Sequence, residues 1–190
     1  MCGPTVLKEA SGWRGKKGEG GGCLRDFASH SIDLVNYLLG EPEQVVGTIF
    51  KKIYSKDVED AVYSTLLYHN GLVGHLHANW SEPSRRKPSY RMEIIGREGR
   101  VIADLHSYKI FLKNAPSNGE FTSGWNIRYI TDLTNSVRFY VRGNEFTQQL
   151  DYFIDCILKK SRGDVCNFAE GLATDLIIEK LIKNSTEGHR

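Results

Sequence analysis

The sequence predicts an α+β fold, an open and mainly antiparallel sheet of about six strands with helices packed on one face. Strand-like runs between residues 45 and 113 follow one another through tight turns, and strands joined in this way pair antiparallel. Helical periodicity is confined to the two ends of the chain. Strands and helices therefore do not alternate as they do in a nucleotide-binding fold, and no Rossmann domain is expected in these 190 residues.

The first expected helix covers residues 23–39. It follows the glycine-rich residues 15–22, a composition typical of a loop. Three aliphatic side chains share one stripe of the helix, namely Ile32, Val35 and Leu39. Gly40, followed closely by Pro42, predicts the end of the helix.

Six strands are expected next, over residues 45–54, 61–69, 72–80, 90–95, 100–104 and 108–113. Asn70-Gly71 predicts a hairpin, because both residues tolerate positive φ, and residues 97–99 predict a second turn. Alternation places Trp80 on the core face, which favours packing over stacking on a sugar. His75 and His77 fall on the other face, where no third ligand has suitable spacing, so no metal site is predicted.

Residues 114–144 are expected to be irregular, with one short strand near residues 137–142. Two helices should close the chain. The first carries an apolar stripe of Phe146, Leu150, Phe153, Ile154, Ile157 and Leu158. Asn167 and Glu170 predict a capping box for the second. That last helix is expected to turn its aliphatic and aromatic positions Phe168, Leu172 and Leu176 inward.

Length and composition indicate one domain over residues 1–190, with residues 1–22 partly loop and residues 185–190 frayed. The 25 basic and 23 acidic residues leave a net charge of +2, too small to indicate a nucleic-acid or membrane partner. No apolar run approaches the roughly 18 residues of a membrane span. The four cysteines show no CxxC spacing, which favours a reducing cytoplasm.

The segment that suggests chemistry runs from Gly20 to Asp33. Asp26 and His30 lie four residues apart and should share one helix face. A carboxylate beside an imidazole favours the protonated ring and fixes its tautomer, which suits His30 for general acid–base work. A solvated salt link is the alternative. The three glycines do not form GxGxxG after a strand, so they predict no dinucleotide site.

This segment resembles the C-terminal domain of the Gfo/Idh/MocA oxidoreductase family. The motifs that carry the resemblance are Trp13-Arg14, Gly20-Gly21-Gly22, Asp26, His30, Asp33-Leu34, Tyr37-Leu38-Leu39-Gly40, Ala78-Asn79-Trp80-Ser81 and the closing helices. The resemblance implies an N-terminal Rossmann domain that binds NAD or NADP and supplies a lysine in a Glu-Lys-Pro motif, neither of which is in this chain. The chain by itself is therefore expected to be inactive.

The resemblance implies that His30 is the general acid–base group on the substrate hydroxyl and that Asp26 orients it or holds the substrate. Asp33 is expected to support the helix. The likeness is strongest to members that oxidise the 3-hydroxyl of UDP-N-acetyl-hexosamines or their uronic acids. A sugar, sugar nucleotide or cyclitol is the expected substrate.

Further substrate-binding residues are expected outside the helix. The basic side chains Arg85, Arg86, Lys87 and Arg91 could bind a diphosphate or a carboxylate, and a charged loop and strand face is the alternative. Asn126 and Tyr129 lie in the irregular segment, where loops often reach substrates. The open sheet face, which carries residues such as Tyr63 and His75, predicts a homo-oligomer interface.

Two other functions stay open. One is a sugar-binding or oligomerisation module without catalysis. The other is a glycoside hydrolase that uses Asp26 and Asp33, although two helical turns would separate these carboxylates by roughly 10 Å, at or beyond the long end of the range for inverting glycosidases.

Overall fold

A computed structural model describes residues 12–82, 84, 88–133, 144–161, 163 and 165–187. The chain forms two compact units. Unit 1 consists of Met1–Tyr90 and Cys166–Arg190, and unit 2 of Arg91–Val165. None of the helices in the described ranges is long and apolar enough to cross a membrane. The predicted combination of helices with antiparallel strands is confirmed, and the strands are divided between two sheets.

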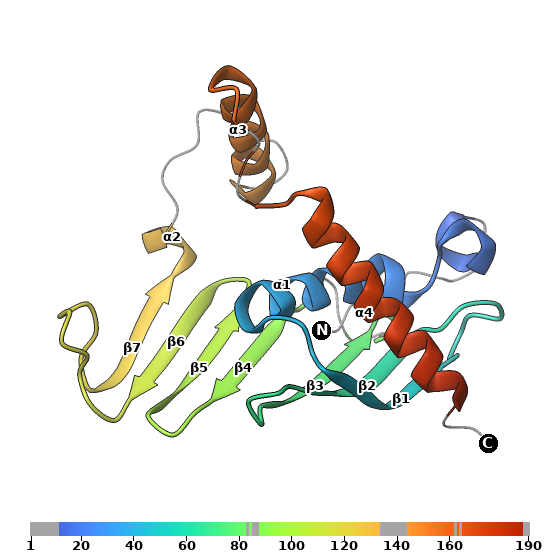
Figure 1. Ribbon diagram of the computed structural model, residues 1–190, viewed down its shortest axis with the longest axis horizontal. Helices are drawn as coiled ribbons and strands as arrows, with labels where there is room; N and C mark the ends of the chain where they lie inside the picture. Colours follow the sequence, from blue (N-terminus) through green and yellow to red (C-terminus); the bar gives the residue numbers. More distant parts are fainter. Residues whose placement is uncertain are drawn as a thin grey trace. The chain divides into compact units, whose positions relative to one another are not determined.

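Unit 1 is built on a three-stranded antiparallel sheet. Its strands are β1 (Gln44–Lys51), β2 (Ala61–Leu67) and β3 (Val73–Asn79), in that order. Helix α4 (Phe168–Glu187) packs against β1 and against α1 (Ser29–Leu39), so helices cover this sheet as predicted (Figure 1). The core between them is apolar, with Leu24, Ile32, Val62, Leu66, Leu76, Ala78, Trp80, Ile177, Ile178 and Leu181 at its centre.

The predicted local signals of unit 1 are confirmed. Gly71 has a φ of +78° in the β2–β3 hairpin, and Leu72 donates its backbone N–H to the Asn70 side chain at 3.0 Å. Gly40 ends α1 with a φ of +79° and donates to the carbonyl of Asn36 at 2.8 Å. These turns depend only on residues within a few positions, so the sequence alone can specify them.

The capping box of α4 also forms as predicted. The Asn167 side chain accepts the backbone N–H groups of Ala169 and Glu170 at 2.9 and 3.1 Å. The Glu170 carboxylate returns to the N–H of Asn167 at 3.0 Å. Helix α4 then continues to Glu187, so the first three of the six residues expected to fray, residues 185–187, are helical.

The inward face of α4 differs from the prediction. Phe168, Leu172 and Leu176 are exposed, with Phe168 99% accessible. A second stripe faces the core instead, made of Thr174, Ile177, Ile178, Leu181 and Ser185. The helix has apolar side chains on two faces, so periodicity could not decide which one meets the sheet.

Asp60 joins the end of β1 to β3 from inside unit 1. Its carboxylate is 1% exposed and accepts the backbone N–H groups of Ile53, Tyr54 and Ser55, at 2.6 to 2.8 Å. It also accepts the Ser55 hydroxyl at 2.5 Å and the indole N–H of Trp80 at 2.8 Å. Burial alone would raise the pKa of Asp60, but these hydrogen bonds outweigh it and lower that pKa. Trp80 is thus a core residue, as predicted.

Unit 2 contains a four-stranded antiparallel sheet in the order β4 (Arg91–Ile95), β5 (Gly99–Asp104), β6 (Ser107–Leu112) and β7 (Gly124–Tyr129). Strand β7 corrects the expectation that residues 114–144 are irregular. Trp125, Ile127 and Tyr129 alternate along it and are all exposed. This alternation is present in the sequence, but the polar residues around it favoured the prediction of an irregular segment. The short strand expected at residues 137–142 lies outside the described residues.

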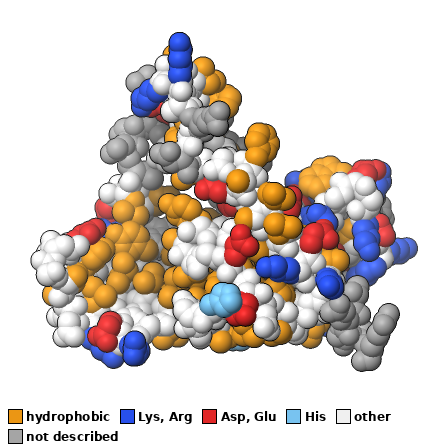
Figure 2. All heavy atoms as spheres, viewed as in Figure 1, with side chains coloured by type: hydrophobic (Ala, Val, Ile, Leu, Met, Phe, Trp, Pro, Cys, Tyr) orange, Lys and Arg blue, Asp and Glu red, His pale blue; other side chains and the backbone are white. Residues whose placement is uncertain are grey.

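The helices of unit 2 are α2 (Ile130–Leu133) and α3 (Asn144–Leu158). The predicted apolar stripe of α3 is present but exposed, at Phe146, Leu150, Phe153, Ile154, Ile157 and Leu158. Hydrophobic side chains also gather over β6 and β7 on the face that Figure 2 shows. Unit 2 therefore presents to its surroundings the kind of side chain that unit 1 buries.

Candidate active site

The segment with Asp26 and His30 begins as a π-helix rather than as the expected regular α-helix. Residues Leu24–Ala28 form this π-helix, η3, and α1 continues from Ser29. Cys23, Leu24 and Ala28 are buried on its inner side. Segments of π-helix are rare and occur frequently at functional sites. The predicted acid–base residues thus lie on an irregular helix whose inner side is fixed in the core.

Arg14 holds Asp26 in place. The Arg14 Nε–H donates to Asp26 Oδ2 at 2.8 Å, and the Arg14 and Asp26 side chains are 46% and 21% exposed. Arg14 belongs to a 3-10 turn, η1 (Trp13–Gly15), and its guanidinium lies 4.7 Å from the centre of the Trp13 ring. Asp26 therefore has a cationic partner that is separated from it by twelve positions in the sequence.

The glycine triplet allows this turn to approach the helix. The N–H of Gly22 donates to the carbonyl of Arg14 at 3.0 Å. A Cβ on Gly21 would lie 2.3 Å from that carbonyl oxygen, and one on Gly22 would lie 2.3 Å from a carboxylate oxygen of Glu59. The glycines thus serve close packing within the protein.

Glu59 holds the start of the helix from the connection between β1 and β2. Its carboxylate accepts the N–H of Leu24 at 2.8 Å, and its backbone carbonyl accepts the N–H of Cys23 at 3.0 Å. Burial raises the pKa of Glu59 above its ordinary value, and the charge of Asp60 adds to this effect. Burial likewise raises the pKa of the Cys23 thiol, so Cys23 is not an activated nucleophile.

His30 is exposed on the first turn of α1. Within the described residues its ring has no hydrogen-bond partner, and the carboxylate of Asp26 is bonded to Arg14 instead. The expected pairing of Asp26 with His30 is therefore not formed, because Arg14 binds the carboxylate. His30 is available to a molecule that approaches from solvent.

Asp33 has a structural contact. Its Oδ1 accepts the hydroxyl of Thr174 at 3.0 Å, which joins α1 to α4. This agrees with the expected supporting role. With Asp26 bonded to Arg14 and Asp33 to Thr174, the geometry offers nothing in favour of a hydrolase that uses the two as an acid–base pair.

Tyr90 adds an aromatic hydroxyl near Asp26. Its ring packs on Phe27, with centroids 5.9 Å apart and planes tilted by 44°. Burial raises the pKa of Tyr90, and the negative charge of Asp26 raises it further. Sequence reasoning missed Arg14, Glu59 and Tyr90 as neighbours of this helix, and only the Trp13-Arg14 motif gave any signal.

The other expected substrate-binding residues that the structure describes belong to unit 2. Arg85, Arg86 and Lys87 lie outside the described residues. Arg91 starts β4 in unit 2 and donates to Glu93 at 3.1 Å. Tyr129 ends β7 and is 55% exposed. Asn126 braces its own loop through hydrogen bonds with the backbone and hydroxyl of Thr122.

His75 and His77 lie on the exposed face of β3, as predicted. The His75 Nδ1 lies 3.3 Å from the Thr65 hydroxyl, and the His77 ring stacks on Tyr63 at 4.7 Å. Burial lowers the pKa of His77. In the described part of the chain, no group of three or more His, Cys, Asp or Glu side chains could hold a metal ion.

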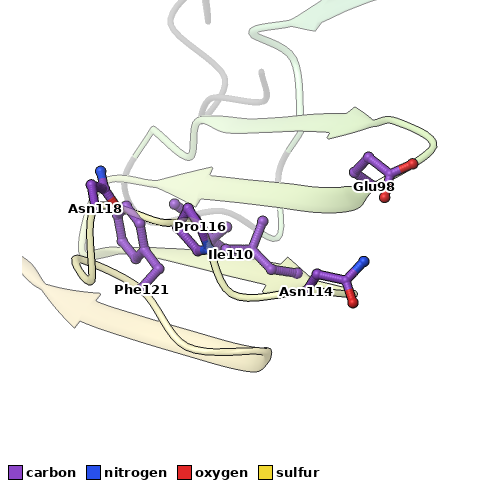
Figure 3. A pocket seen from close by; sticks show the side chains of 7 residues that line it. Glu98, Ile110, Asn114, Pro116, Asn118 and Phe121 are labelled. Atoms are coloured by element: carbon purple, nitrogen blue, oxygen red, sulfur yellow. The ribbon is translucent and has the colours of Figure 1, made fainter.

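Each unit contains a hollow. One, in unit 2, has a volume of about 550 Å³ and is lined mainly by apolar side chains (Figure 3), with Glu98 at one end and Ile110, Pro116 and Phe121 grouped at the other. The second, of about 260 Å³, lies at the start of η3 beside Glu59 and Lys17. Neither is lined by His30 or Asp26.

The described residues do not fit a dinucleotide. A phosphate-binding loop needs a glycine turn that leads from a strand into a helix and leaves its N–H groups free for the ligand. Here the glycine triplet follows a 3-10 turn, and the N–H groups of Gly21 and Gly22 are used by the carbonyls of Lys16 and Arg14. These residues therefore provide no nucleotide cradle.

The family model described as the GFO/IDH/MocA C-terminal domain matches residues 3–102. This match covers the glycine triplet, η3, α1, the strands β1 to β4 and the first four residues of β5. No curated protein matches the chain closely enough to count as a relative.

Solved structures share the fold at low sequence identity. A levoglucosan dehydrogenase in complex with NADH and levoglucosan has 20% identity and a TM-score of 0.77, over 98% of this chain and 55% of the other. The WlbA dehydrogenase of Bordetella pertussis, in complex with NADH and UDP-GlcNAcA, has 18% identity and a TM-score of 0.72, over 97% and 51%.

The UDP-N-acetylglucosamine 3-dehydrogenase GnnA of Acidithiobacillus ferrooxidans is also similar, with 18% identity and a TM-score of 0.62 over 97% and 51% of the two chains. The present chain thus spans about half the length of these solved structures.

Proposed function

Since the chain belongs to the Gfo/Idh/MocA family through its C-terminal domain, we propose that it is the catalytic and substrate-binding half of an NAD(P)-dependent oxidoreductase. The proposed reaction transfers a hydride between NAD(P) and a secondary alcohol of a sugar, a sugar nucleotide or a cyclitol. The nucleotide would be held by residues outside the described ones, and its nicotinamide would supply the hydride acceptor.

The task of this chain is to manage the proton and to hold the substrate. In the direction of oxidation, the hydroxyl proton passes to His30, and in the reverse direction His30 returns a proton to the carbonyl oxygen. Asp26, fixed by Arg14, would accept a hydrogen bond from the substrate. Holding the alcohol in line with the hydride acceptor accounts for much of the rate gain in such reactions.

The observation that carries this proposal is the setting of His30. Its imidazole is exposed within a family-matched helix, four residues after an aspartate whose carboxylate is anchored by Arg14. A histidine has an ordinary pKa near neutrality, so an accessible imidazole can take up and release a proton at physiological pH.

The test uses the intact protein encoded by the gene. Sugars, sugar nucleotides and cyclitols are screened for reduction of NAD⁺ or NADP⁺, and His30→Ala is compared with wild type on any substrate found. We expect kcat to fall by about a hundredfold or more, the usual contribution of a general acid–base group. His69→Ala, at an exposed histidine in the β2–β3 turn, is the matched control. Full turnover by His30→Ala would remove His30 from its role.

The substrate proposal extends to UDP-N-acetyl-hexosamines and their uronic acids. The similarity to GnnA and WlbA supports it, although the similarity to levoglucosan dehydrogenase supports an uncharged sugar equally. The screen separates the two, because only one class should be oxidised efficiently. A location in the cytoplasm is part of the proposal, supported by the free cysteines Cys23, Cys156 and Cys166.

A homo-oligomer formed through an open sheet face is also proposed, and β7 in unit 2 offers such a face in addition to the expected one with Tyr63 and His75 in unit 1. The exposed aromatic and aliphatic side chains along β7 support it, since large exposed apolar patches mark interaction sites. Trp125→Asp in the intact protein should reduce the mass measured by analytical ultracentrifugation to that of a smaller species. An unchanged mass would exclude this face as the interface. If the intact protein assembles but reduces no nicotinamide, the non-catalytic module becomes the better description.

A further inference from the structure

Two side chains near Asp26, those of Trp13 and Arg14, make no direct contact with the substrate in the proposed reaction. The Trp13 indole is 43% exposed, and the Arg14 guanidinium lies 4.7 Å from its ring centre. Arg14 also reaches Asp26, so an aromatic ring, a cation and a carboxylate are adjacent. All three belong to unit 1.

The Arg14–Asp26 pair retains unused hydrogen-bonding capacity. A guanidinium carries five N–H donors, and Arg14 uses its Nε–H on Asp26 Oδ2. Within the described residues no other partner is recorded for its Nη groups, nor for Oδ1 of Asp26. A donor edge and an acceptor oxygen therefore lie side by side, with the Arg14 side chain 46% exposed.

The charges of this pair cancel. An anion placed at the guanidinium would also face the carboxylate of Asp26, which opposes its binding. An uncharged group that both donates and accepts suits the pair better, since one hydroxyl can donate to Oδ1 while its neighbour accepts from Arg14. Two adjacent hydroxyls on a sugar ring have this pattern.

The Trp13 ring completes the match to a sugar. Sugars present C–H groups on the faces of their rings, and an exposed indole offers a flat apolar surface with a polar edge. The backbone turn that carries the ring is held in place, because the Trp13–Gly15 turn is bonded to the glycine triplet through the carbonyl of Arg14. Little conformational entropy is lost when such a prearranged surface binds a ligand.

We propose that Trp13, Arg14 and Asp26 form a subsite for two neighbouring hydroxyls of an uncharged sugar ring, with Trp13 as the stacking surface and Arg14 as the donor. The inference rests on the proposed function only for the claim that the bound sugar is the substrate. It assigns Arg14 two roles, since the residue positions Asp26 and contacts the ligand.

The test measures binding to the intact protein by calorimetry, without nucleotide. The probes are levoglucosan, which is uncharged, and UDP-N-acetylglucosamine, which carries a diphosphate. Arg14→Gln and Trp13→Ala should each raise the Kd for levoglucosan by about tenfold, the loss expected for one charge-assisted hydrogen bond or one stacked ring. The matched controls Arg97→Gln and Tyr54→Ala, both at exposed sites, should change Kd less than twofold.

Arg14→Lys keeps the charge beside Asp26 but loses the planar fork, so it tests the donor role if Arg14→Gln fails to fold. We expect weaker levoglucosan binding in this variant too. Unchanged binding in the Arg14 and Trp13 variants would overturn the proposal, as would no binding of levoglucosan by wild type. A strongly salt-dependent loss confined to UDP-N-acetylglucosamine would also overturn it, because Arg14 would then be an anion-binding residue.

The outcome is separable from that of the proposed function. Nicotinamide reduction that is insensitive to Trp13 and Arg14 substitution leaves the enzyme assignment standing and removes the subsite. Levoglucosan binding that is lost in these variants, in a protein that reduces no nicotinamide, leaves the subsite standing and removes the enzyme assignment.

Discussion

Units 1 and 2 bury their apolar side chains in opposite ways. The hydrophobic side chains that are fully buried in the described residues all belong to unit 1. In unit 2, β7 and α3 leave aromatic and aliphatic side chains 39 to 74% exposed. Unit 1 thus has a closed apolar core, and unit 2 has open apolar surfaces.

The difference shows which unit holds its candidate functional residues in place through its own contacts. In unit 1, the helix that carries Asp26 and His30 is held by Arg14, Glu59 and the core beneath it, so its geometry depends on residues of the same unit. The exposed stripes of unit 2 gain little stability from the contacts described here, since burial of apolar area is the main favourable term in folding. Four experiments would break or sharpen this contrast.

The largest effect is expected from Asp60→Ala. Five donors would lose their acceptor, of which the Trp80 indole is buried and the other four are part-buried and within reach of water. A wholly unmet buried group costs about 1 to 3 kcal/mol, so with partial compensation by water the free energy of unfolding should fall by on the order of 4 kcal/mol. Urea denaturation measures this, with the exposed Glu41→Gln as control. A loss below about 1 kcal/mol would mean that solvent reaches this region.

Asp60 also makes unit 1 sensitive to acid. Its pKa is lower in the folded protein than its ordinary 3.8, so the stability it provides is present above that value and is lost as the pH falls through the folded pKa. Asp60→Ala should lack this part of the acid dependence.

Two isoleucines test the contrast between the units directly. Ile178 is 2% exposed in unit 1, and Ile127 is 40% exposed in unit 2. Ile178→Ala should lower the free energy of unfolding by about 3 kcal/mol, because it opens a cavity in the core, and Ile127→Ala by less than about 1 kcal/mol. Equal losses in the intact protein would show that β7 is covered and would end the contrast.

Two glycines with positive φ test the packing at the helix start. Gly22, with a φ of +115°, faces the carboxylate of Glu59, whereas Gly47, with a φ of +63°, has open space around it. Gly47→Ala should cost about 1 kcal/mol from backbone strain alone, and Gly22→Ala about 1 to 2 kcal/mol more. Both losses of stability are measured by thermal denaturation. Equal losses in the two variants would mean that the Glu59 side chain moves aside without cost.

The smallest effect is the pH dependence that Glu59 contributes. Its folded pKa is raised above the ordinary value of 4.5, so its protonated form is favoured in the folded protein, and this contribution is lost as the pH rises through the folded pKa. Glu59→Gln cannot ionise and keeps an acceptor for the Leu24 N–H. The stability of wild type relative to this variant should therefore decrease as the pH rises from the ordinary value of 4.5 through the folded pKa. A difference that is constant with pH would contradict the raised pKa.

Local signals were the ones that the sequence could resolve. The Asn70-Gly71 hairpin, the Gly40 stop and the Asn167–Glu170 capping box each involve groups within a few positions, so their geometry follows from backbone sterics and nearby donors. Alternation likewise placed Trp80 in the core and His75 and His77 on the open face of β3. The motif around Asp26 and His30 identified the family in the same way.

By itself, then, the sequence determined the antiparallel strands β1 to β6, the turns, the capping box of α4 and the helix that carries His30. Only the tertiary structure decided that Arg14 rather than His30 binds Asp26, that Glu59 holds the helix start, and that α4 buries Ile178 rather than Leu172. The physical reason is distance along the chain. A contact between residues that are far apart in sequence depends on how whole elements pack, and a helix with two apolar faces leaves that choice to the surface it meets.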